Sequence, residues 1–133
     1  MTSMLEPESL LVCSQLAISG FNCAVYAPTE FLLHNPGAYI GAVHFCNEGL
    51  GRKGQSQLAE ACVGGVGAQA AKENAGDYTA VEQVCLTCAN RMQRETCMRQ
   101  GLEYYKQSNG NDIPKHLCDS LTKLKGLCLS FGK

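Results

Sequence analysis

The sequence predicts an all-α fold in which disulfide bonds staple about four helices into two helical hairpins. Nine of the 133 residues are cysteines, spread along the whole chain. Apolar residues recur at helical spacing, and no segment alternates polar and apolar residues for long enough to predict a sheet. There is no Trp, and five Tyr and four Phe are the only aromatics. The core is therefore thin, and covalent cross-links would stabilise it.

The first hairpin is predicted to occupy residues 1–76. Its first helix runs from Pro7, whose missing N–H needs no partner in a first helical turn, to Tyr26. Residues 29–35, between two prolines, form one further turn. Residues 37–46 are apolar and form either a helix or a short strand.

The second element of this hairpin follows a glycine-containing loop over residues 47–54. Helical spacing then continues from Gln55 to Gly76. Glycine destabilises an isolated helix by up to about 1 kcal/mol relative to Ala, but it lets a neighbouring helix approach closely. The glycines concerned are Gly64, Gly65 and Gly67.

The second hairpin is predicted to occupy residues 77–133. Its first helix starts at a capping box, in which the Thr79 hydroxyl and the Glu82 carboxylate each accept a backbone N–H of the other residue. This helix ends before the turn sequence that starts at Ser108. The next helix runs from Pro114 to Phe131. Its apolar stripe consists of Leu117, Leu121, Leu124 and Cys128.

Cysteine spacing suggests which helices the disulfides join. Two gaps, Cys13/Cys23 and Cys118/Cys128, enclose nine residues. A step of ten residues advances about 15 Å along a helix, so each such cysteine would meet a cysteine of an antiparallel neighbour. The candidate pairs are Cys13–Cys62, Cys23–Cys46, Cys97–Cys118 and Cys88–Cys128, with Cys85 as the spare thiol. Eight cysteines allow 105 connectivities, so this pairing is a hypothesis.

Metal ligation and unbonded buried thiols are the alternatives to disulfides. Cys85 and Cys88 form the only Cys-x2-Cys pair, and a zinc site needs a second pair nearby. A copper(I) site would need further closely spaced cysteines. The same pair lies inside a predicted helix without a preceding strand, which favours a structural role over thioredoxin-type redox activity.

No residue set typical of an enzyme is found. His34, His44 and His116 are scattered, and no pair of carboxylates stands out for acid–base chemistry. The run from Gly64 to Gly67 lacks the Lys-Ser/Thr of a phosphate-binding loop. We therefore expect no catalytic residues, no cofactor and no bound metal.

Charge and hydropathy limit the partners. Residues 1–51 carry four Glu and no Lys or Arg, whereas the remaining residues carry eleven basic and eight acidic side chains. Neither part is basic enough to predict nucleic-acid binding. The longest apolar run, residues 38–45, is far too short to span a membrane. Residues 1–16 show neither a signal peptide nor a transit peptide pattern.

The two nine-residue gaps, together with a chain that shows no presequence, resemble the twin Cys-x9-Cys (CHCH) proteins of the mitochondrial intermembrane space. These are disulfide-locked helical hairpins that are imported without a presequence. The doubled hairpin is similar to the two-CHCH accessory subunits of respiratory complexes. The resemblance implies a non-catalytic assembly subunit, peripheral to the inner membrane, with other subunits of the complex as partners.

A secreted or periplasmic helical binding module is the alternative prediction. Disulfide-rich helical bundles of that kind enclose a lipid or bind a protein ligand, and their signal peptide is removed from the mature chain. The apolar interior predicted here is small for such a module, and its cysteine order differs from those of saposins and plant lipid-transfer proteins.

Overall fold

The computed structural model describes Leu10, Cys13 and residues 20–74, 77–110 and 113–131. Within these residues the regular structure is entirely helical, which confirms the predicted disulfide-stapled all-α fold. The elements are α1 (Gly20–His34), α2 (Tyr39–Gly49), the 3-10 helix η3 (Gly51–Lys53), α3 (Ser56–Glu73), α4 (Tyr78–Cys85), α5 (Arg91–Ser108), α6 (Lys115–Asp119) and α7 (Lys125–Phe131). The seven α-helices in this part of the chain exceed the four predicted.

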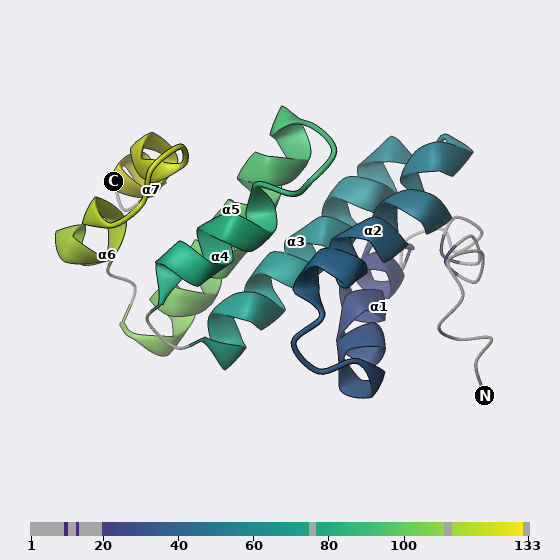
Figure 1. Cartoon of the computed structure of the whole chain (residues 1–133), viewed down its shortest axis with the longest axis horizontal. Coiled ribbons are helices and arrows are strands. Elements are labelled where there is room, and N and C mark those ends of the chain that lie inside the picture. Colours follow the sequence, from purple (N-terminus) through teal and green to yellow (C-terminus); the bar gives the residue numbers. More distant parts are fainter. Residues whose placement is uncertain (1–9, 11–12, 14–19, 75–76, 111–112, 132–133) are drawn as a thin grey trace.

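Helix α3 lies in the middle of the protein, between α1 and α2 on one side and α4 and α5 on the other (Figure 1). Helices α6 and α7 form a small C-terminal hairpin at the end of the molecule beyond α5. The predicted helix start at Pro7 lies outside the described residues. The predicted break at Pro28 is wrong, because α1 continues through Pro28, which is fully buried.

The glycines of α3 bring helix backbones into direct contact. A Cβ atom on Gly65 would lie 2.2 Å from the carbonyl oxygen of Val25 in α1. A Cβ atom on Gly67 would lie 2.0 Å from the carbonyl oxygen of Cys97 in α5. Real Cβ atoms never approach other atoms so closely, so only glycine fits at either position. The prediction that these glycines allow close helix packing is confirmed.

The core around α3 is built from aliphatic and sulfur-containing side chains. Its largest fully buried members are Leu50, Val63, Val66, Val81, Met98 and Leu102. Tyr78 adds a polar tether, because its buried hydroxyl donates a hydrogen bond of 2.7 Å to the carbonyl oxygen of Gly101. Burial of this hydroxyl raises the pKa of Tyr78 well above its usual value. Aliphatic and sulfur-containing side chains, with few aromatics, therefore fill this core, as the composition predicts.

The helix predicted to start at Thr79 and to end before Ser108 is interrupted after Cys85. Helix α5 has its own N-cap, Asn90, whose side-chain oxygen accepts the N–H of Gln93 at 2.9 Å. The buried Gln93 amide also exchanges two hydrogen bonds with Asn47 of α2, at 2.8 and 3.1 Å. These contacts fix a new helix direction, so the chain turns back between α4 and α5.

The capping box predicted at the start of α4 does not form. Asp77 is the N-cap, and its carboxylate accepts the N–H of Ala80 at 3.2 Å. The Thr79 hydroxyl donates instead to Ser120 at 3.2 Å, and Glu82 points away from its own helix terminus toward the C-terminal hairpin. Local sequence suggested the box, but tertiary contacts use these two side chains elsewhere.

The predicted helix from Pro114 to Phe131 is two short helices, α6 and α7, joined by a turn over residues 120–124. Its apolar stripe was correctly identified as core, since Leu117, Leu121, Leu124 and Cys128 are all buried. The continuity was wrong, because the turn exposes backbone N–H groups that bind Glu82.

The predicted disulfide pairing is wrong throughout. The bonds are Cys13–Cys23, Cys46–Cys62, Cys85–Cys97 and Cys118–Cys128, with Cα–Cα distances between 5.5 and 5.7 Å. None of the predicted pairs, Cys13–Cys62, Cys23–Cys46, Cys97–Cys118 and Cys88–Cys128, is present, and the free thiol is Cys88 rather than Cys85. The prediction assumed continuous helices, in which cysteines ten residues apart are about 15 Å apart. Between α6 and α7, for example, the 120–124 turn brings Cys118 and Cys128 together instead.

The division into units 1–76 and 77–133 stays a prediction. In the described part of the chain, the most extensive helix packing joins α3, from the first unit, to α5, from the second.

Candidate functional site

The C-terminal hairpin is attached to α4 through the buried carboxylate of Glu82, which is only 2% exposed. This carboxylate accepts hydrogen bonds from the backbone N–H groups of Thr122 and Leu124, each at 2.9 Å. It also accepts a hydrogen bond of 3.2 Å from the Thr122 hydroxyl. Hydrogen bonds to an ionised acceptor are stronger than neutral ones. The arrangement, called here the Glu82 clasp, holds the 120–124 turn in place.

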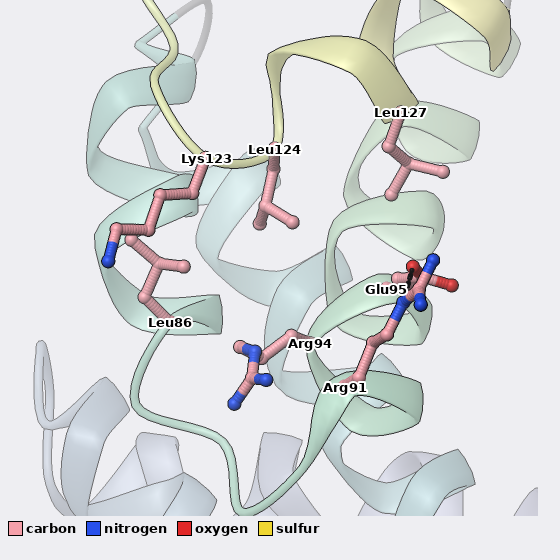
Figure 2. Close-up of a pocket in the computed structure, with 7 residues that line it drawn as sticks. All are labelled: Leu86, Arg91, Arg94, Glu95, Lys123, Leu124 and Leu127. Atoms are coloured by element: carbon pink, nitrogen blue, oxygen red, sulfur yellow. Dashed lines mark hydrogen bonds and ion pairs between the residues drawn. The ribbon is translucent and has the colours of Figure 1, made fainter.

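Between this turn, the end of α4 and the start of α5 lies a recess of about 640 Å³, called here the basic recess (Figure 2). Three cations and three leucines dominate its walls. Leu124 points into it from the hairpin, and Arg94 enters it from α5. The lining residues are Leu86, Arg91, Arg94, Glu95, Lys123, Leu124 and Leu127. Its volume falls within the range of about 300–1,000 Å³ that is typical of small-molecule sites.

The positive charge of the basic recess is only partly neutralised. Arg91 donates a hydrogen bond of 2.8 Å to Glu95, and Arg99 lies 3.7 Å from the same carboxylate. The hydrogen bond from Arg91, with the nearby charges of Arg99 and Arg94, lowers the pKa of Glu95, so its carboxylate is ionised. In contrast, the side chains of Arg94 and Lys123 form no hydrogen bond or ion pair with any residue that the structure describes.

Cys88 lies in the turn between α4 and α5, in the same segment as the recess wall. It is buried, and burial raises the pKa of its thiol from 9.0 to about 12, although the charge of Arg94 acts in the opposite direction. The thiolate is the reactive form of cysteine, so this thiol is inert at neutral pH. Cys85 is bonded to Cys97, so Cys85 and Cys88 do not form a redox pair with each other.

The histidines lie apart from the recess. His34 and His44 are exposed beside Glu30 and Glu48, at 3.6 and 3.7 Å, and His116 is exposed on α6. The described residues contain no group of three or more His, Cys, Asp or Glu side chains that could hold a metal ion. The glycines from Gly64 to Gly67 are buried in helix packing rather than forming a loop.

No helix within the described ranges is long and apolar enough to cross a membrane. Comparisons of the chain with protein-family models, with curated proteins and with solved structures find no match. The function is therefore inferred from the site alone.

Sequence reasoning did not identify the basic recess. Arg91 and Arg94 are three residues apart and therefore share one face of α5, which is a readable signal. In a continuous helix from Pro114 to Phe131, Lys123 would lie on the face away from the apolar stripe. The 120–124 turn instead brings Lys123 and Leu124 to the recess together, and nothing in the local sequence marks that turn.

Proposed function

We propose that this protein is a non-catalytic binding module of an oxidising compartment, and that it binds an anionic ligand in the basic recess. The observation that carries this proposal is the pair of cations, Arg94 and Lys123, that line the recess without a direct ion pair or hydrogen bond to any described residue. Both side chains are free to bind a ligand, and a bound anion would form charge-assisted hydrogen bonds with them.

The composition of the basic recess supports binding rather than catalysis. Its single carboxylate, Glu95, is ionised and paired with arginines, so it is poorly suited to donate or accept a proton in a reaction. The nearby thiol, Cys88, is buried and protonated. Neither group has the tuned pKa that general acid–base or nucleophilic catalysis requires.

Four disulfides in a chain of this length are typical of an oxidising compartment, which includes the cell exterior, the periplasm and the mitochondrial intermembrane space. We favour a secreted or periplasmic location. The resemblance to CHCH proteins rests on pairs of cysteines nine residues apart on one helix, and here each such pair is bonded to itself.

An accessory subunit of a mitochondrial inner-membrane complex, on the intermembrane-space side, is the second candidate function. The observation that favours it is a set of exposed apolar side chains on α1 and α2. Tyr26 and Leu33 are each 70% exposed, and Ile40 is 62% exposed. Native co-purification tests this candidate. A stable complex that is lost on substitution of Leu33 by Ser would support it, whereas a monomeric protein in native extracts would contradict it.

Anion binding is tested by titrating the ¹⁵N-labelled protein with inorganic phosphate and with butyrate. We expect chemical-shift changes at residues 91–95 and 123–127, and their loss in the double variant Arg94→Gln/Lys123→Gln. The matched control is Lys53→Gln/Lys72→Gln, which removes two exposed positive charges away from the recess. Equal shift changes in the two double variants would overturn the proposal, since binding would then follow net charge alone.

A further inference from the structure

The arginines and most of the leucines of the basic recess lie on different walls. Arg91 and Arg94 come from the start of α5, whereas Leu124 and Leu127 come from the C-terminal hairpin on the other side (Figure 2). Lys123 lies with Leu86 at a third side. A lysine side chain has a long methylene stem below its charge, so this side is apolar near the wall and positive at its tip. The recess thus offers one ligand both a charged contact and an apolar contact.

The apolar wall keeps surface that the protein itself does not cover. Leu86 and Leu127 are only half-buried, although both line a concave site. A small inorganic anion would contact the cations and leave these leucines in water. A recess of about 640 Å³ has room for much more than such an anion, and apolar atoms placed against the leucines would be removed from water with a gain in affinity.

The cations divide into a paired and an unpaired set. Arg91 is 84% exposed and already bonded to Glu95. Arg94 is half-buried and Lys123 is exposed, and neither forms a direct ion pair with a residue in the described ranges. The unpaired cations would therefore hold the charged end of a ligand, and the leucines would hold its apolar part.

From this arrangement we propose that the ligand is a single-chain amphiphilic anion, with a carboxylate or phosphate headgroup at Arg94 and Lys123 and an alkyl chain against Leu86, Leu124 and Leu127. This inference rests on the proposed function, because it names the ligand class of the same recess. A free fatty acid and a single-chain phospholipid share this chemistry.

The test is calorimetric titration with laurate, below its micelle concentration, beside butyrate, dodecanol and dodecyl phosphate. Each methylene buried raises affinity about fourfold, so laurate should bind at least 100-fold more tightly than butyrate. Dodecanol, which lacks the charge, should bind at least tenfold more weakly than laurate. Whichever of laurate and dodecyl phosphate binds more tightly identifies the headgroup.

Two matched variants test the apolar wall. Leu127→Ser should reduce laurate affinity about tenfold and leave butyrate binding unchanged. Leu33→Ser, which alters an exposed leucine on α1, should change neither. Circular dichroism of both variants confirms that the helices are retained before binding is compared.

The possible failures are distinct. If laurate binds no more tightly than butyrate, or if dodecanol binds as well as laurate, the amphiphile inference is wrong while the anion site stands. If laurate binding is unaffected by both Leu127→Ser and Arg94→Gln/Lys123→Gln, the inference is also wrong. If neither phosphate, butyrate nor laurate perturbs the recess, the proposed function fails with it.

Discussion

The contact between α3 and α5 and the contact between α4 and the C-terminal hairpin join helices in different ways. In the first, a glycine lets one helix backbone lie directly against the other, with Gly67 facing the carbonyl oxygen of Cys97. In the second, one buried carboxylate, Glu82, binds the N–H groups of a turn. The first contact tolerates no added atom, whereas the second combines buried leucines with the hydrogen bonds of one side chain.

This difference separates the protein into parts of unequal local stability. Packing around α3 is apolar and continuous, so losing it should unfold the whole chain. The C-terminal hairpin is small, and it is held by its short apolar stripe together with the Glu82 clasp, so we expect it to detach before the rest unfolds. Local opening of this kind is common in proteins and often involves binding regions. The basic recess lies at this boundary and uses residues from both parts.

The largest expected effect is that of Gly67→Ala. The added Cβ would lie 2.0 Å from a backbone oxygen, so α3 and α5 must separate. Overpacking against rigid backbone costs about 3 kcal/mol or more. The free energy of unfolding, from urea denaturation followed by circular dichroism, should fall by that amount. Gly126→Ala is the control, since a Cβ there meets nothing within 4 Å. Equal stability of the two variants would contradict the close packing.

Glu82→Gln should have an intermediate and local effect. The neutral amide keeps the shape of the side chain but weakens the hydrogen bonds to the turn, at a cost of about 2 kcal/mol. Hydrogen exchange of the Thr122 and Leu124 amides should accelerate about 30-fold, while amides of α3 and α5 should change much less. Glu103→Gln, on α5, is the matched control. Uniform acceleration throughout the chain would show that the hairpin does not open separately.

The smallest expected effect concerns Cys88, in the turn where the two parts meet. The native thiol keeps its proton to about pH 12, whereas an unperturbed thiol loses it near pH 9.0. The unfolded state therefore deprotonates first, and stability falls as the pH rises above 9. Between pH 8 and pH 10 the loss is about 1.4 kcal/mol. It is measured as the difference between the original protein and Cys88→Ala, and equal pH profiles would exclude a buried protonated thiol.

The features of the fold that the sequence could predict are those set by residues close together in the chain. Glycines within a helix indicate close packing, and the stripe from Leu117 to Cys128 identified buried residues even though the helix itself was broken. Asn90 followed three residues later by Gln93 fits a helix N-cap, and it is the local signal for the start of α5. Several segments of this chain contain residues that could cap a helix. Tertiary contacts determine which of them do so.

The parts that could not be predicted depend on groups distant in sequence. The turn over residues 120–124 contains no proline or glycine, and it forms because the Glu82 carboxylate, 40 residues away, binds its N–H groups. The disulfide pairing was wrong for the same reason, since it followed from helices taken as continuous. The basic recess exists only after this turn has formed, so its residues had no shared signal in the sequence.

The order of the disulfides has a consequence for synthesis. A chain that enters an oxidising compartment N-terminus first presents its thiols one after another, and three of the four native partners are simply the next cysteine to arrive, 10 to 16 residues later. Such short loops close at little entropic cost. The exception is Cys85, which meets Cys88 before its true partner Cys97. Oxidation during translocation would therefore favour native pairing at most cysteines. The non-native bond that a disulfide isomerase would need to correct is Cys85–Cys88.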